Sequence, residues 1–91
     1  MEKVLATISD GAAGSWQMSN RGQTMVDDAF DFGFAIEWMV KDLGIALAEA
    51  ERLGAPTPIA STVAEYYEEL MGSGESRSDT SALIRRLRST D

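Results

Sequence analysis

Lys41 and Asp42 are adjacent side chains whose types and position suit chemistry on an anionic ligand. At 100° per residue, a helix here places Lys41 on one stripe with Phe34, Trp38 and Ile45. An ammonium group on an apolar stripe costs free energy unless it has a partner or faces a ligand. Two interpretations stay open: a lysine that reaches water or pairs with a carboxylate, and a cation that meets an anionic ligand at a cleft.

Asp42 lies at the edge of the same stripe. Its carboxylate either orients a ligand hydroxyl or holds Lys41, or it is an ordinary exposed acid of a helix. A second candidate is the turn of small residues from Gly11 to Ser15, because amides before a helix can bind an anion. Small residues in such turns more often reflect close packing, so this signal is weak.

The composition excludes several classes of site. The chain has no cysteine and no histidine, so it offers no disulfide, no thiolate zinc site and no Ser-His or Cys-His pair. We predict no metal site and no catalytic residue, and we interpret Glu68 and Glu69 as a solvated face.

The charge and hydropathy of the chain limit the kinds of partner that it can bind. The net charge is −7, with 15 acidic and 8 basic residues, which argues against nucleic-acid binding. The one basic cluster, Arg85, Arg86 and Arg88, is interpreted as the solvated face of a last helix. No apolar run approaches the roughly 20 residues of a membrane span, and the first residues do not resemble a signal peptide. We expect a cytoplasmic protein without a membrane partner.

The apolar periodicity predicts an all-α fold, a bundle of about five helices within a single domain, residues 1–91. The expected helices cover residues 2–9, a segment from a Ser15 cap to about 25 that Gly22 interrupts, about 34–53, a segment capped by Thr57, and a last helix capped by Ser78 or Asp79. We expect Trp16 to anchor the second helix. The long helix is apolar on two sides, which predicts burial between neighbours.

An ordered set of short motifs resembles the β-hydroxyacid dehydrogenases, a family that includes 3-hydroxyisobutyrate dehydrogenase and tartronate semialdehyde reductase. The motifs cover most of the chain and are Gly11-Ala-Ala-Gly-Ser-Trp16, Asn20-Arg-Gly22, Met25, Phe30, Gly33-Phe34, Lys41-Asp-Leu43 and Asp79 before a final helix. Each motif is weak by itself, and their order makes the resemblance specific. Phe32 departs from it, because relatives often have proline there.

The resemblance implies a Rossmann domain that binds NAD or NADP, followed by an all-α domain like the C-terminal domain of 6-phosphogluconate dehydrogenase-like enzymes. It implies that this chain is part of that C-terminal domain, without the Rossmann domain and without the interdomain helix that carries the catalytic lysine in a Gly-x-x-x-Lys-x-x-Asn motif. Lys41 matches the later Lys-Asp-Leu motif and is not that lysine. By the same resemblance, Phe34 and Asp42 line the substrate side of the cleft and bind the substrate, and Lys41 approaches the cofactor or the substrate and is predicted to bind the cofactor.

The sequence thus predicts the substrate-cleft and dimerisation part of an NAD(P)-dependent 3-hydroxyacid dehydrogenase, inactive alone and without a cofactor of its own. The expected partners are a second copy, in a homodimer, and a small hydroxyacid in the full-length enzyme. The alternative is a stand-alone helical module that self-associates and has no catalytic role.

Overall fold

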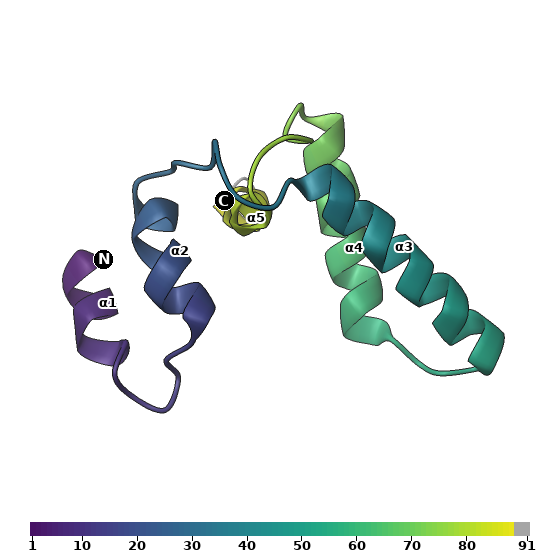
Figure 1. The fold of residues 1–91 in the computed structure, drawn as a ribbon, viewed down its shortest axis with the longest axis horizontal. Helices are drawn as coiled ribbons and strands as arrows, with labels where there is room; N and C mark the ends of the chain where they lie inside the picture. Colours follow the sequence, from purple (N-terminus) through teal and green to yellow (C-terminus); the bar gives the residue numbers. More distant parts are fainter. Residues whose placement is uncertain (89–91) are drawn as a thin grey trace. The chain divides into compact units, whose positions relative to one another are not determined.

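The computed structural model describes residues 1–88, and this part of the chain is helical throughout, with no strand. The elements are α1 (Glu2–Ile8), α2 (Trp16–Val26), α3 (Ile36–Leu53), α4 (Pro58–Gly72), the 3-10 helix η1 (Thr80–Ala82) and α5 (Leu83–Arg88) (Figure 1). The predicted all-α fold is confirmed. No helix among residues 1–88 is long and apolar enough to cross a membrane.

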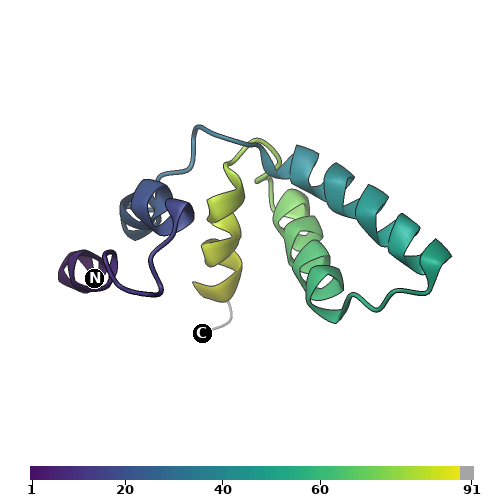
Figure 2. The ribbon, with the colours of Figure 1, turned by 60° about the horizontal axis from the view of Figure 1, so that its bottom comes forward.

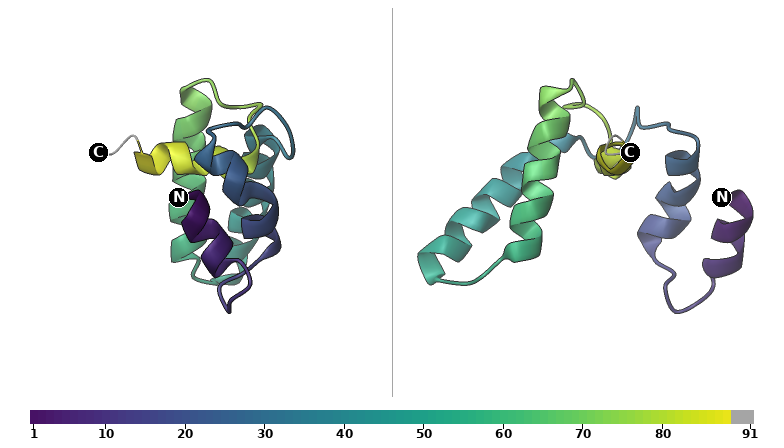
Figure 3. Two further views of the ribbon diagram at one scale, coloured as in Figure 1. Left: turned by 90° about the vertical axis from the view of Figure 1, so that its left-hand side faces the viewer. Right: turned by 180° about the vertical axis from the view of Figure 1, so that it is seen from behind.

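The helices form two compact units, Met1–Phe30 and a second unit that begins at Asp31. A single domain over residues 1–91 therefore stays a prediction, and its last three residues lie outside the described part of the chain. Figure 3 shows the α1–α2 pair and the α3–α4 pair from two further sides.

The first unit is a pair of short helices that pack through Leu5 and Gly22. Gly22 is buried, and a Cβ there would lie 2.8 Å from Leu5 Cδ2, so the glycine lets the helices approach closely. The predicted Ser15 cap is confirmed, since its hydroxyl accepts a 2.9 Å hydrogen bond from Met18 N–H. The expected interruption at Gly22 is wrong: α2 runs through it without a break.

Trp16 is not the buried anchor that the sequence suggests. Its side chain is 65% exposed, and the Arg21 guanidinium lies 5.1 Å from the centroid of its ring. Position 16 is the first residue of α2, where a side chain points back toward the preceding turn rather than into the pair. A cation–π contact across one turn replaces the expected core contact.

The second unit is built on the α3–α4 hairpin, with α5 packed on α4 (Figure 2). The predicted end of the long helix at Gly54 is confirmed, and Gly54 adopts the left-handed conformation, φ 70°. Pro58 starts α4 and Thr57 is its N-cap residue, as predicted, although the Thr57 side chain makes no capping hydrogen bond. The core of this unit consists of Ile36, Ala64, Tyr67, Leu70 and Ala82.

The long helix begins two residues later than predicted. Phe34 lies outside it, and Ala35 has extended backbone angles, φ −63° and ψ 140°. The reason is a pairing with a distant segment: Thr80 N–H donates to the Phe34 carbonyl at 2.9 Å, and Ile36 N–H donates to the Ser78 carbonyl at 2.9 Å. These bonds hold residues 34–36 extended before the helix can start.

The expected burial of α3 on two sides is also wrong. Met39, Val40, Leu43, Leu47 and Ala50 are half-buried on the side that the hairpin covers. On the other side, Trp38 is 52% exposed and Ile45 is 62% exposed. One apolar face of α3 is therefore open within this unit.

Candidate functional site

The backbone before α3 is held by Asp79, whose side chain is 1% exposed. Asp79 Oδ1 accepts a 3.0 Å hydrogen bond from Phe34 N–H, and Oδ2 accepts a 3.0 Å hydrogen bond from Ser81 N–H. The Ser81 hydroxyl donates to Oδ2 as well. The predicted cap at Asp79 is confirmed, and the same carboxylate also fixes a residue 45 positions earlier.

Tyr67 supports the same segment from α4. Its hydroxyl donates a 2.9 Å hydrogen bond to the Thr80 carbonyl. Burial raises the pKa of the Tyr67 phenol above its ordinary value, and the negative charge of Asp79 raises that pKa further. The phenol therefore stays a neutral donor over the physiological pH range.

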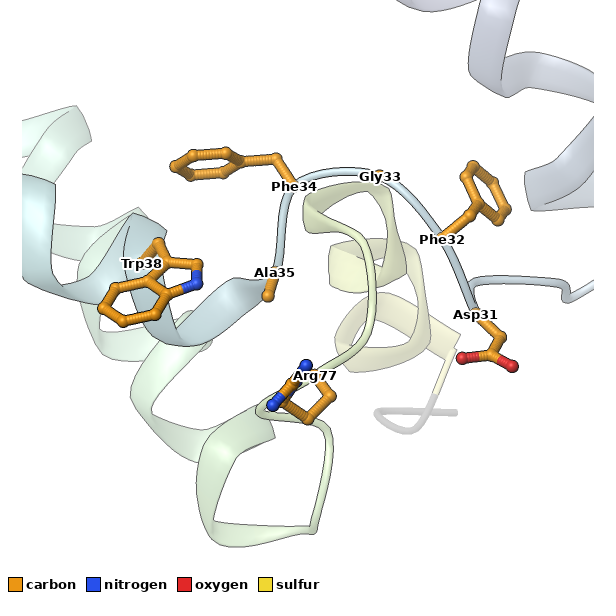
Figure 4. Close-up of a pocket in the computed structure, with 7 residues that line it drawn as sticks. All are labelled: Asp31, Phe32, Gly33, Phe34, Ala35, Trp38 and Arg77. Atoms are coloured by element: carbon orange, nitrogen blue, oxygen red, sulfur yellow. The ribbon is translucent and has the colours of Figure 1, made fainter.

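An open pocket of about 320 Å³ lies where the fixed segment meets the start of α3. Its lining residues are Asp31, Phe32, Gly33, Phe34, Ala35, Trp38 and Arg77 (Figure 4). Gly33 has a φ of 76°, a conformation in which a side chain would be strained, and it turns the chain into the pocket wall. In the close-up, the Phe34 and Trp38 rings are both drawn on the left, and Arg77 is drawn below Ala35.

Lys41 lies one turn beyond the pocket on α3. Its Nζ lies 5.9 Å from the centroid of the Trp38 ring, and its side chain is exposed. Its apolar neighbours Trp38 and Ile45 are themselves exposed, so Lys41 does not lie on a buried stripe, and a lysine that reaches water and a cation that meets a ligand both remain compatible with this geometry. The ammonium is held over an aromatic face and stays available to an anion.

The predicted site residues lie in the first turns of α3 or just before it, and not all of them line the pocket. Phe34 is 46% exposed and lines the pocket, Lys41 contacts the pocket residue Trp38, and Asp42 is exposed on the helix and does not line the pocket. The roles assigned to these residues stay predictions. Trp38 and Arg77 were not predicted as site residues, because Trp38 belongs to a helix that was expected to be buried between neighbours, and Arg77 lies in a loop whose position depends on the fold.

Arg77 adds positive charge to the pocket. It lies 3.8 Å from the Glu37 carboxylate, and its side chain is 88% exposed. A pair this exposed is weak, so the guanidinium can turn to an anionic ligand. Aromatic rings beside an arginine and a lysine can stack a planar ring and bind a phosphate or a carboxylate.

The other sequence candidates take structural roles. A Cβ on Gly14 would overlap the Ser9 carbonyl oxygen, which supports close packing as the reason for the Gly11 to Ser15 turn. The basic cluster is only partly the solvated face that was predicted. Arg85 pairs with Glu75 at 2.5 Å, and Arg86 pairs with Glu69 while its guanidinium stacks 4.5 Å from the Tyr66 ring centroid. Among residues 1–88, no group of acidic side chains is arranged to hold a metal ion.

The comparisons with known proteins agree on one family. Residues 1–87 match a family model described as the NAD-binding part of NADP-dependent 3-hydroxyisobutyrate dehydrogenase. An oxidoreductase of Shewanella frigidimarina is 54% identical over 93% of this chain and 29% of its own length. L-threonate dehydrogenase of Escherichia coli K12 is 32% identical over 93% of this chain and 28% of its own.

A solved structure shows the same fold. A 3-hydroxyisobutyrate dehydrogenase from Salmonella typhimurium superposes with a TM-score of 0.82 at 31% identity, over 92% of this chain and 30% of that protein. The chain thus spans less than a third of the length of these relatives.

The match corrects one part of the prediction. The resemblance gave NAD binding to a separate Rossmann domain and made this chain a C-terminal substrate domain, whereas the family model names the matched residues as NAD-binding. That assignment followed from the order of the motifs and from the expectation that a Rossmann domain binds the cofactor. A helical segment needs no glycine-rich fingerprint to contact a dinucleotide, because stacking rings and cations suffice. With 87 of its residues matched, the chain belongs to the family of the NAD-binding segment of NADP-dependent 3-hydroxyisobutyrate dehydrogenase.

Proposed function

We propose that this chain forms one wall of the NAD(P) and substrate cleft of a dehydrogenase that interconverts a small 3-hydroxyacid and its semialdehyde, of the 3-hydroxyisobutyrate or tartronate semialdehyde type. The observation that carries the proposal is the exposed end of α3. There Phe34, Trp38 and Lys41 present two rings and a cation beside the pocket. The family match supports a dinucleotide as the ligand.

Each residue has a distinct proposed role. Lys41 binds a phosphate or another anionic group of NAD(P), since its ammonium is exposed and lies beside the ring of the pocket residue Trp38. Phe34 packs its ring against the substrate or the nicotinamide at the mouth of the pocket. Asp42, one residue beyond Lys41, accepts a hydrogen bond from a substrate hydroxyl.

We propose that the chain does not turn over substrate by itself. The described residues lack a sheet, so any Rossmann-type phosphate turn must come from another part of the enzyme. The side chains around the pocket also include no histidine or lysine placed as a general base. The hydride carrier and the proton acceptor would both come from that other part.

A segment-swap enzyme tests this proposal. In it, this chain replaces the matched segment of the Salmonella typhimurium 3-hydroxyisobutyrate dehydrogenase, which already shares its fold. We expect NAD(P)-dependent oxidation of 3-hydroxyisobutyrate by the swapped enzyme and no turnover by the 91-residue chain alone. A folded swap that binds cofactor no better than the enzyme without the segment would contradict the proposal.

Self-association is a separate proposal for a different surface. Leu53 and Ile59 are 64% and 76% exposed and flank the loop that joins α3 to α4. Exposed apolar side chains that gather in one region are typical of an interface. We propose that this end of the hairpin forms a homodimer contact, and that the alternative function, a non-catalytic self-association module, uses the same contact. We also propose that the protein is located in the cytoplasm.

A further inference from the structure

We infer that Asp79 is a positioning residue of the proposed cleft, which holds the Phe34 ring at the mouth of the pocket through the Phe34 backbone. This inference rests on the proposed function. It adds a residue that never touches the ligand and whose sequence context indicates only a helix cap.

The two oxygens of the Asp79 carboxylate accept hydrogen bonds from different segments of the chain. Oδ2 accepts from Ser81 N–H and from the Ser81 hydroxyl, and this is the capping role. Oδ1 accepts from Phe34 N–H at 3.0 Å, outside the helix that Asp79 caps. A serine or threonine would satisfy the cap alone, because a hydroxyl also accepts from an N–H one turn into the helix. The second oxygen binds Phe34 N–H.

The surroundings make this contact rigid. Asp79 is 1% exposed, and the backbone around it pairs with residues 34–37 through three further bonds: Thr80 N–H to Phe34 O, Ile36 N–H to Ser78 O and Glu37 N–H to Ser76 O. Tyr67 holds the Thr80 carbonyl from α4. A buried charge in this place is stabilised by the N–H groups that point at it.

The fixed backbone determines where the Phe34 ring can lie. Gly33, with a φ of 76°, brings the chain around immediately before Phe34, and α3 starts two residues after it. Between these points Phe34 N–H and C=O are both bonded to the Asp79–Thr80 segment. The Phe34 side chain can still rotate, but its backbone is held in place. A ligand that stacks on the ring therefore loses less conformational entropy on binding than it would with a mobile segment.

Two complementary variants separate the two roles. Asp79→Ser keeps a hydroxyl for the Ser81 N–H but cannot reach Phe34. Asp79→Asn keeps one oxygen for Phe34 N–H, with its amide nitrogen toward the Ser81 hydroxyl, and gives up the capping bond. In the 91-residue chain, amide hydrogen exchange at Phe34 should become about tenfold faster in Asp79→Ser and change little in Asp79→Asn. Ser81→Ala, which leaves Oδ1 and Phe34 in place, is the matched control.

The segment-swap enzyme provides the functional readout. Asp79→Ser should raise the KM for cofactor or substrate about as much as Phe34→Ala does, with a smaller change in kcat, and the double variant should be no worse than Phe34→Ala. A purely structural role predicts that the two effects add. Additive effects, or an unchanged Phe34 exchange rate in Asp79→Ser, would overturn the inference. Unchanged kinetics in Phe34→Ala would instead overturn the proposed function, while the exchange result still decides the role of Asp79.

Discussion

A 3.0 Å hydrogen bond joins Asp79 Oδ1 to the backbone N–H of Phe34, across 45 residues of sequence. It links the start of the last helical segment to the residue before α3 that lines the pocket. One carboxylate, that of Asp79, thus caps η1 and also holds the segment before α3 that lines the pocket.

Tyr67→Phe should lower the free energy of unfolding by about 1 to 2 kcal/mol, because it leaves the Thr80 carbonyl without the phenol that donates to it. Chemical denaturation at pH 7 measures this change. Tyr66→Phe is the matched control, since Tyr66 is only half-buried and its ring lies against Arg86 at the surface. Equal losses in the two variants would mean that the Thr80 contact contributes nothing.

The stability of the wild type should also fall at alkaline pH through Tyr67. Its pKa is raised in the folded chain by burial and by Asp79, so the folded state holds the proton more tightly than the unfolded state. This contribution is fully present below the unfolded pKa of about 10 and is lost as the pH rises toward the folded pKa. The difference in the free energy of unfolding between the wild type and Tyr67→Phe should therefore shrink between about pH 9 and about pH 11. A constant difference would contradict the raised pKa.

Two glycine-to-alanine changes should have opposite signs. Gly14→Ala should destabilise the first unit by about 1 to 3 kcal/mol, because the new Cβ would overlap the Ser9 carbonyl oxygen and the backbone must shift. Gly44→Ala should stabilise α3 by about 0.5 to 1 kcal/mol, since no atom lies within 4 Å of its Cβ position and alanine favours a helix. Thermal melts followed by circular dichroism compare them. If Gly14→Ala melts at the wild-type temperature, the turn is not tightly packed.

Glu75→Gln should loosen the attachment of α5 to the second unit. Glu75 pairs with Arg85 at 2.5 Å and accepts from the Ser78 hydroxyl at 2.6 Å, and its side chain is 19% exposed. We expect a loss of about 1 kcal/mol that becomes smaller at 1 M salt. Glu68→Gln, on the exposed face of α4, is the control and should change the stability by less than about 0.5 kcal/mol. A salt-independent loss would indicate packing rather than the ion pair.

The 91-residue chain should be a dimer at micromolar concentration in static light scattering. Ile59→Glu should give a monomer, because it places a charge in the exposed apolar end of the α3–α4 hairpin. Lys41→Ala, at the other end of α3, should leave the dimer intact. A wild-type monomer with a sharp melting transition would contradict the proposed contact.

The helical class and most helix ends could be predicted from the sequence because local signals determine them. Ser15 and Asp79 cap the helices that follow them, and Gly54 ends α3 in the left-handed conformation, as their residue types suggest. The start of α3 could not be predicted in this way, since it depends on backbone pairing between residues 34–36 and 78–80. That pairing has no signature in either segment alone.

The site was predicted in part for the same reason. Lys41 and Phe34 are recognisable from their place in ordered motifs, but periodicity cannot tell an exposed apolar stripe from a buried one. Trp38 was therefore expected to be buried with the rest of the long helix, although half of it is exposed. Arg77 reaches the pocket from a loop more than 35 positions after Trp38 in the chain, and only the fold brings the two together.

The most direct test of the account compares the two lysines of the chain in the segment-swap enzyme. Lys41→Ala removes the cation over Trp38, and Lys3→Ala removes an exposed lysine of α1 with the same change in net charge. The account predicts that Lys41→Ala raises the KM for NAD(P) about tenfold or more, as the loss of one charge-assisted contact does, whereas Lys3→Ala leaves that KM within about twofold of the parent. Equal KM values for the two variants, with both enzymes folded and active, would contradict it.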